Sequence, residues 1–535
     1  MREFLDGKVK LFSGDCLEVL PTLERFDACV TDPPYLLSDA GPGESHFGMS
    51  LNKFDGSDYK AIVCVFLYGG NDYANTLVTY DDASYDQYSA IRGGGASRTA
   101  GGIALAQSAL TATELKPATL DVPVDSLGVQ RKFALNPTMT GLTHLFNTGK
   151  MAVQLNVGPL VKPLTRAQYN SSDKVANPRP PQLFSHNDQQ SVWQSSSPEG
   201  STIGWGGNLG DLALAPNPVL NTPAQFTCIS VTGNAVFLSG DTALQYQVST
   251  SGAIQIKSAA PGATIYGSST AASGAMTVSA AMRTILQQSG SHKLENEYNK
   301  VTGRAIAAET KVTDALKLTD ATATPTAGVP LATVCPTGNS LADQLKMVAR
   351  LIKGRSVLGA QRQVFMVSIG GFDLHDNLIR DHGGILGKVS AAMTAFYDAT
   401  VEMGVANKVT AFTASDFGRT LASNGDGSDH GWGSHHFIVG GAVKGQKFYG
   451  TAPPINVTDG TVVSGVRTYT AAEQWHVGQG RLLPSTSVDQ YAATLAKWFG
   501  VTTTEMPTVL PKIVNFGNLA TPPRLDYPVD LGFML

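Results

Sequence analysis

Two side chains of types that bind metal ions follow an apolar segment of this sequence. Asp373 and His375 are two residues apart and come directly after the apolar segment 364–369 and the pair Gly370-Gly371. A carboxylate and an imidazole on such a short loop can point to the same place, and this ligand set suits divalent ions such as zinc or manganese. The pair therefore predicts part of a metal site.

A further carboxylate and a further histidine occur later in the chain. Asp416 follows the apolar segment 409–413, and Arg419, three residues on, could bind an anionic group with two hydrogen bonds. Six of the ten histidines fall in the last third of the chain, which favours a site there. His436 leads into an apolar stretch and is expected in the core, so His430, in an Asp-His-Gly sequence, is the better ligand candidate.

Two other candidates have both a functional and a structural interpretation. Asp72 ends a Gly-Gly-Asn-Asp sequence after the apolar segment 61–68, where it could bind a metal ion or close the loop as an Asx turn. Ser185 precedes an expected helix start and could be its N-cap. It could also be a nucleophile, because a helix N-terminus steadies a phosphate or sulfate and a nearby metal ion activates a hydroxyl.

A sheet is needed to bring these distant residues together. Continuous apolar segments indicate buried strands, and segments with helical periodicity lie between some of them. We expect strands at 61–68, 151–157, 364–369, 409–413 and 437–439, and helices at 341–352 and 385–403. This alternation predicts an α/β fold with a mostly parallel, doubly wound sheet flanked by helices. Functional residues of such a sheet gather at the carboxyl ends of its strands, where the candidates lie.

The composition argues against several classes of protein. Only 15% of the residues are charged, the net charge is -4, and no run of Lys and Arg occurs, so we expect no nucleic-acid partner for the main part of the chain. The five cysteines lack metal-site spacing. No apolar segment reaches the length of a membrane span. The N-terminus as written carries no secretory signal, which predicts a cytoplasmic protein.

Three regions differ in composition. Residues 1–58 are comparatively charged and end in a Gly, Ser and Asp-rich junction, and residues 59–535 form the expected main domain. Within that domain, residues 239–330 are poor in aromatics and rich in small residues. We expect this stretch to be a low-complexity insertion or cap on the sheet domain, with some helix near 280–288.

Several separated segments of the main domain resemble the bacterial family known as domain of unknown function 1501. They are residues 64–72, 182–190, 370–377, 415–420, 429–431 and 478–484. The resemblance covers residues 59–535. It implies an alkaline-phosphatase-like fold, of the superfamily that also holds sulfatases and phosphoglycerate mutases. Members of the family typically carry a twin-arginine export signal, so the resemblance implies a periplasmic or exported location for the main domain.

The resemblance to this superfamily also implies a two-metal hydrolase site. The residues that match its pattern are Asp72 as the first aspartate, Ser185 as the nucleophile, Asp373 and His375 as the central pair, Asp416 as the aspartate of the later strand, and His430 as the last ligand. Phe417 stands where the second histidine of the superfamily would be. One metal position is therefore altered, lost, or rebuilt from Asp429 or His435.

The first 50 residues resemble the start of an amino-group (N4/N6) DNA methyltransferase. Residues 9–20 are followed by Asp32-Pro33-Pro34-Tyr35, a tetrapeptide with which such enzymes hold an extruded base. The glycine-rich loop for S-adenosylmethionine and the rest of the sheet do not follow. We therefore expect a truncated fragment joined to another gene's product, without methyltransferase activity.

The sequence thus predicts a metal-dependent hydrolase of phosphate or sulfate esters, whose substrate is a small anionic ester. Ser185 would attack and Arg419 would bind the anion. One or two divalent ions would be held by Asp72, Asp373, His375, Asp416 and His430. The alternatives are a non-catalytic envelope or binding protein with the same fold, suggested by Phe417, and a DNA methyltransferase acting through the N-terminal fragment.

Overall fold

The computed structural model describes residues 2–4, 9–11, 58–215, 220–254, 284–285, 288, 290–319, 333–464 and 466–535. The chain divides into two compact units, Met1–Met49 and Ser50–Leu535. In the first unit, β1 (Arg2–Phe4) pairs antiparallel with β2 (Val9–Leu11). The methyltransferase-like tetrapeptide 32–35 and most of the helix expected near 280–288 lie outside the described residues.

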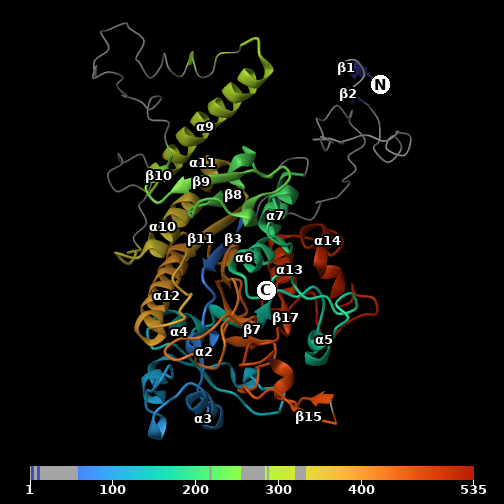
Figure 1. The fold of residues 1–535 in the computed structure, drawn as a ribbon. Helices are drawn as coiled ribbons and strands as arrows, with labels where there is room; N and C mark the ends of the chain where they lie inside the picture. Colours follow the sequence, from blue (N-terminus) through green and yellow to red (C-terminus); the bar gives the residue numbers. More distant parts are fainter. Residues whose placement is uncertain are drawn as a thin grey trace. The chain divides into compact units, whose positions relative to one another are not determined.

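One large mixed sheet forms the centre of the second unit (Figure 1). Its ten strands lie in the order β10-β9-β8-β11-β3-β12-β13-β7-β14, with β17 also paired to β7. Only β10 and β13 run antiparallel to their neighbours in this described sheet. The strands are β3 (Lys60–Leu67), β7 (Met151–Gly158), β8 (Cys228–Ser230), β9 (Gln245–Ser249), β10 (Gly252–Ala253), β11 (Arg362–Ile369), β12 (Val409–Ser415), β13 (Ser434–Gly440), β14 (Lys447–Tyr449) and β17 (Thr486–Ser487).

The central strand β3 is buried on both faces of the sheet, as its continuous apolar sequence predicts. Val63 and Val65 belong to the same apolar core as residues of α10 (Ser340–Lys353) and α12 (Leu378–Glu402). Apolar residues of α10 recur at helical spacing, which turns one side of this helix to the core. Helices α6, α7 and α13 lie on the other side of the sheet from α10 and α12 (Figure 1). The predicted α/β fold with a mostly parallel sheet is confirmed.

The remaining elements surround this sheet. They are the helices α2 (Tyr73–Thr76), α3 (Asp82–Ile91), α4 (Thr140–Asn147), α5 (Arg166–Asn170), α6 (His186–Ser195), α7 (Trp205–Leu214), α9 (Lys293–Lys317), α11 (Arg355–Leu358), α13 (Val488–Phe499) and α14 (Met506–Val509), a small sheet of β4 (Leu77–Thr79), β5 (Glu114–Leu115) and β6 (Phe133–Leu135), and the hairpin of β15 (Thr461–Val463) and β16 (Val466–Thr468). Among the described residues, no helix is both long enough and apolar enough to cross a bilayer.

The region 239–330, in which the sequence suggests an insertion or cap, contributes to the edge of the main sheet where it is described. Strands β9 and β10 extend the sheet beyond β8. Helix α9 contacts β10 and the helices α10 and α11.

The strand directions bring four loops to one edge of the sheet. β11, β3 and β12 are adjacent and parallel, so Ile369, Leu67 and Ser415 lie in register at their carboxyl ends. β13 runs the other way and therefore begins, at Ser434, on this same edge. The loops after β3, β11 and β12 and the loop before β13 carry the predicted site residues except Ser185, which lies at the start of α6.

Candidate metal centre

Three side chains converge at the carboxyl edge of the sheet in a way that can hold a metal ion. His186, Asp373 and His430 each offer one ligand atom, and these atoms all lie within 4.8 Å of one another. His186 Nε2 is 3.4 Å from Asp373 Oδ2, and His430 Nε2 is 3.2 Å from Asp373 Oδ1. A tetrahedral ion with bonds of about 2.0–2.1 Å keeps its ligand atoms roughly 3.4 Å apart. The two histidine–aspartate distances, which involve different oxygens of Asp373, are close to this spacing.

His186 is oriented by Asp416, the residue that follows β12. Its Nδ1 lies 2.6 Å from Asp416 Oδ2, so this carboxylate oxygen accepts a hydrogen bond from the Nδ1 proton. The neutral ring then carries its lone pair on Nε2, which is buried and has no hydrogen-bond partner in the described part of the chain. A histidine held by a carboxylate with its free nitrogen aimed at a ligand cluster is the usual arrangement at metal sites. This hydrogen bond raises the pKa of His186, which favours the protonated ring, so a metal ion would have to displace a proton from Nε2.

His430 is oriented in the same way by a backbone carbonyl. Its Nδ1 lies 2.7 Å from the carbonyl oxygen of Phe184, which can only accept, so Nε2 of the neutral ring faces Asp373. Phe184 has a φ of 75°, a left-handed conformation that is costly for an aromatic residue. Burial lowers the pKa of His430, which favours the neutral ring that binds metal ions.

Asp373 is held by the guanidinium of Arg419. Arg419 Nη1 donates to Asp373 Oδ1 at 2.9 Å and to the carbonyl of Gly69 at 3.1 Å, while Nε donates to the carbonyl of Ser428 at 3.0 Å. Burial raises the pKa of Asp373, but the hydrogen bond and charge of Arg419 outweigh this effect and the pKa ends below its usual value. The carboxylate is therefore ionised and ready to bind a cation. Arg419 itself is fully buried, so its position suits fixing Asp373 rather than meeting a substrate.

His375 lies beside the three converging ligands. Its Nε2 is 3.0 Å from both Asp373 Oδ1 and His430 Nε2, and its Nδ1 is 3.5 Å from Asp429 Oδ1. The side chain is 45% exposed, more than that of His186 or His430. A small rotation would let His375 complete the coordination or contact a bound substrate.

The structure places Asp72 in a buried ion pair. Its two carboxylate oxygens each accept a hydrogen bond of 2.7 Å from Arg92, and Oδ1 also accepts from the backbone of Ala74 as the N-cap of α2. The bond from Ala74 is the loop-closing role that the sequence left open, whereas the ion pair with Arg92 was not expected. Asp72 is not part of the three-residue group, and a metal ion there would have to compete with Arg92.

Ser185 is the N-cap residue of α6, so the predicted helix start is confirmed. Its hydroxyl makes no capping hydrogen bond and instead donates to Asp188 Oδ2 at 2.8 Å. Ser185 is adjacent in sequence to His186, one of the three converging ligands. Asp188 is positioned to accept a proton from its hydroxyl.

Phe417 fills the place next to the two ligand imidazoles. Its ring centroid is 4.9 Å from that of His186 and 4.6 Å from that of His430. Gly70, with a φ of +79°, makes room for this ring, because a Cβ there would lie 2.4 Å from a Phe417 carbon. An apolar ring has no lone pair for a cation, so Phe417 supplies no metal ligand at this position.

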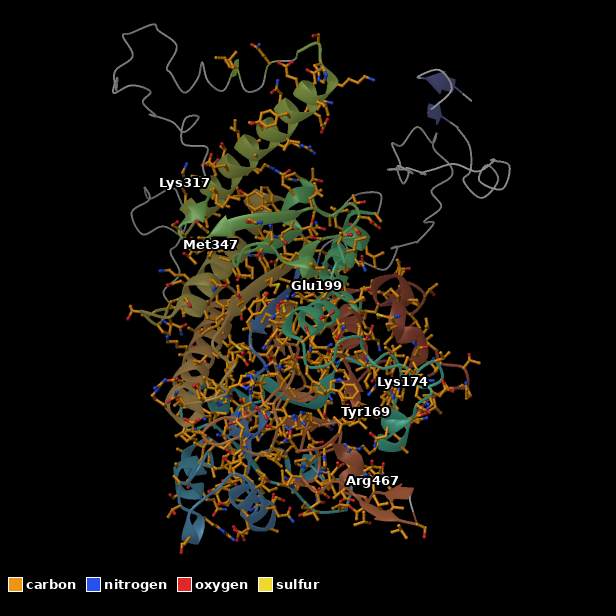
Figure 2. All side chains as sticks on the ribbon, in the orientation of Figure 1. Tyr169, Lys174, Glu199, Lys317, Met347 and Arg467 are labelled. Carbon is orange, nitrogen blue, oxygen red and sulfur yellow. The ribbon has the colours of Figure 1, made fainter. Side chains whose placement is uncertain are left out.

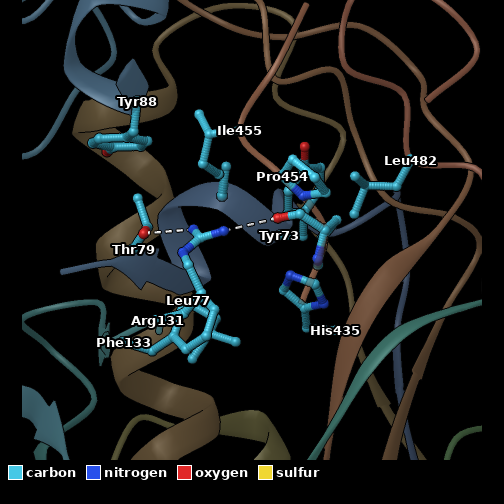
Figure 3. Close-up of a pocket in the computed structure, with 12 residues that line it drawn as sticks. Tyr73, Leu77, Thr79, Tyr88, Arg131, Phe133, His435, Pro454, Ile455 and Leu482 are labelled. Atoms are coloured by element: carbon cyan, nitrogen blue, oxygen red, sulfur yellow. Dashed lines mark hydrogen bonds between the residues drawn. The ribbon is translucent and has the colours of Figure 1, made fainter. Parts of the chain in front are cut away.

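The other histidines of the C-terminal part are structural. Burial lowers the pKa of His382 to about 4, of His435 to about 3, of His436 to about 3 and of His476 to about 4. His436 is in the core, as its apolar sequence context predicts. His435 Nδ1 accepts a hydrogen bond from the backbone of Asn156, and the ring lines a cavity of about 20 Å³ together with Tyr73 and Arg131 (Figure 3). This cavity holds about one water molecule and includes none of the three ligands.

Comparison with known families bears directly on this arrangement. The family described as "Protein of unknown function (DUF1501)" matches residues 59–467, a span that contains all three converging ligands. The chain belongs to this family. A search of curated proteins found no match.

In this DUF1501 chain, the residue that sequence reasoning missed is His186. It stands in the segment 182–190 that carries the family resemblance, yet its neighbour Ser185 received the functional interpretation. Gln190, one turn further along α6, was missed too, and its Nε2 donates to Asp416 Oδ2 at 2.9 Å. The available signal was a histidine at a helix start inside a family motif.

Proposed function

We propose that this DUF1501 protein is a metal-dependent hydrolase of phosphate or sulfate esters with an alkaline-phosphatase-like fold. The observation that carries the proposal is the geometry of His186 and His430. Each has its Nδ1 bound by an acceptor and its Nε2 facing an ionised carboxylate, Asp373, at the edge of the sheet. Three protein ligands with further positions open toward solvent characterise catalytic rather than structural zinc sites.

The chain's own residues would share the work as follows. His186, His430 and Asp373 would hold one divalent ion, such as zinc or manganese, and His375 stands next to them. Such an ion, when bound, polarises an ester oxygen and makes a nearby hydroxyl or water a better nucleophile. Asp416 would keep His186 in its binding orientation.

Ser185 is the nucleophile that we propose. Its hydroxyl donates to Asp188, which would take the proton as the Ser185 oxygen bonds to the phosphorus or sulfur atom and the ester alcohol leaves with a proton from water. A second water molecule would then release the phosphate or sulfate and restore Ser185. The first backbone N–H groups of α6 lie at the same helix end and would steady the anionic ester. If a water molecule held among the same residues attacked the ester instead, hydrolysis would not depend on Ser185.

A binding protein that keeps the ion without chemistry is the second candidate. It is favoured by Phe417, whose ring occupies a position where the related two-metal design has a histidine, and by Arg419, whose guanidinium is fully buried.

Metal analysis and a hydrolase screen distinguish these functions. Purified protein is dialysed against zinc or manganese, its metal content is measured, and phosphate and sulfate esters are offered to the wild type, His186→Ala and Ser185→Ala. We expect about one ion per chain, lost in His186→Ala, and hydrolysis that falls in both variants. His144→Ala, which removes an exposed imidazole of α4, is the matched control. Metal binding without any hydrolysis would favour the binding protein, and no metal binding would contradict both.

A further inference from the structure

Arg481 presents a partly exposed guanidinium next to the metal-binding group. Its Nε donates to the carbonyl oxygen of His430 at 2.8 Å, and its Cζ lies 5.6 Å from the centroid of the Phe184 ring. Phe184 is also the residue whose carbonyl orients His430. Arg481 is therefore tied to the same two residues that build one side of the candidate metal centre.

The backbone around Arg481 is a tight turn that fixes where its side chain starts. Arg481 N donates to the carbonyl of Gly478 at 2.9 Å, and Val477 N donates to the carbonyl of Arg481 at 2.8 Å. Three successive residues of the turn, 478–480, have positive φ angles. The turn is anchored by Tyr73, whose hydroxyl donates to the carbonyl of Gly480 at 3.0 Å. The guanidinium is thus held in place before any ligand arrives.

The terminal nitrogens of Arg481 differ from those of the other arginines near this edge. Arg419 and Arg92 are fully buried and use their guanidinium nitrogens on Asp373 and Asp72. Arg481 donates through Nε alone to the residues that the structure describes, which leaves the fork of its two terminal nitrogens available. A planar guanidinium fork matches two oxygens of a phosphate or sulfate group.

We propose that Arg481, rather than Arg419, binds the anionic oxygens of the ester substrate. The proposal deepens the function proposed above and rests on it for the reaction, but it does not require that hydrolysis takes place. Stacking on Phe184 and the bond to His430 orient the guanidinium in advance, so little side-chain freedom is lost when an anion binds.

The guanidinium of Arg481 also interacts with the carboxylate of Asp429. Burial lowers the pKa of Arg481, because the cation has lost part of its hydration, while the charge of Asp429 acts in the opposite direction. Asp429 is itself shared with His375 and Asn424. Arg179 stacks on the ring of Tyr169, and Tyr169 also interacts electrostatically with Arg481.

Binding of inorganic phosphate and inorganic sulfate tests the proposal. Each anion is titrated by calorimetry into wild type, Arg481→Gln and Arg481→Lys, with the protein once metal-free and once loaded with zinc. Arg467→Gln is the matched control, because Arg467 is an exposed arginine of β16 paired with Asp459 (Figure 2). The zinc affinity of every variant is measured separately.

We expect Arg481→Gln to weaken anion binding by about 10-fold or more, since a charge-assisted pair of hydrogen bonds is lost. Arg481→Lys should recover only part of the affinity, because a lysine lacks the fork. Arg467→Gln should bind the anions like the wild type. The metal-free titrations show the loss in Arg481→Gln apart from any change in its zinc affinity. The anion that binds more tightly shows whether phosphate or sulfate esters suit the site.

Two results would overturn the role of Arg481. One is equal anion affinity in the wild type and Arg481→Gln, and the other is a wild type that binds neither anion in either form. If zinc fails to bind while the metal-free protein still binds an anion through Arg481, the anion site stands and the metal-dependent hydrolase falls.

Discussion

Replacing Asp416 by asparagine tests whether the carboxylate behind His186 holds that ligand in place. Asp416 Oδ2 accepts hydrogen bonds from His186 Nδ1 at 2.6 Å, from Gln190 Nε2 at 2.9 Å and from Gly69 N at 3.1 Å. Asparagine keeps the shape but removes the negative charge, and hydrogen bonds to a charged acceptor are about twice as strong as neutral ones. Loss of such an outer partner costs about 10- to 100-fold in metal affinity, or about 1.4–2.7 kcal/mol.

The measurement is a competition between the metal-stripped protein and a chromogenic zinc chelator. Thermal unfolding shows in parallel that Asp416→Asn is folded. Asp489→Asn is the control, because Asp489 is also a buried carboxylate but bonds to the hydroxyls of Ser196 and Ser487. Zinc affinity in Asp416→Asn within about 2-fold of the wild type would refute the reasoning. An equal loss in Asp489→Asn would show that the effect is not specific to the site.

Three further outcomes follow from buried groups around the sheet. Asp72→Asn should lower the free energy of unfolding by about 3–5 kcal/mol, because it leaves Arg92 buried without its anion. The zinc affinity of this variant should equal that of the wild type, and a loss of zinc binding would instead make Asp72 a ligand. Gly70→Ala should cost about 1–3 kcal/mol in urea unfolding, since its Cβ would lie 2.4 Å from the Phe417 ring, and an unchanged midpoint would contradict this packing. Burial raises the pKa of Asp489 from 3.8 to about 6, so its contribution to stability is complete below pH 3.8 and is lost as the pH rises toward 6. The unfolding free energy of wild type minus that of Asp489→Asn should therefore fall by on the order of 3 kcal/mol between about pH 4 and about pH 7, and a flat difference would refute the shifted pKa.

The strands of the central sheet could be predicted because continuous β-branched and aromatic segments favour strands that are buried on both faces of a sheet. β3 and β7 begin and end within a residue of the expected segments. Their order across the sheet could not be predicted, because strand pairing depends on contacts between residues hundreds of positions apart. The reversal of β13 was missed for the same reason, although it decides that His430 reaches the site from the start of a strand.

The candidate site was predicted in its location but only partly in its roles. Asp373 and His430 converge where the sequence places them, whereas Asp416 lies behind His186 and holds it. Spacing along the chain shows that a carboxylate leaves a strand end but not which way it turns. Asp72 illustrates the same limit, since its partner Arg92 lies on a segment that the motif does not include. The methyltransferase resemblance of residues 1–50 and the superfamily assignment stay predictions.

Helix α6 brings one ligand, His186, to two others that come from much later in the chain. The ligands Asp373 and His430 sit on loops of the sheet itself, whereas α6 packs against the sheet from outside (Figure 1). An ion bound by all three would cross-link an early and a late part of the polypeptide. Amide hydrogen exchange in α6 should then be slower with zinc than without it, which would show that the ion links the two parts.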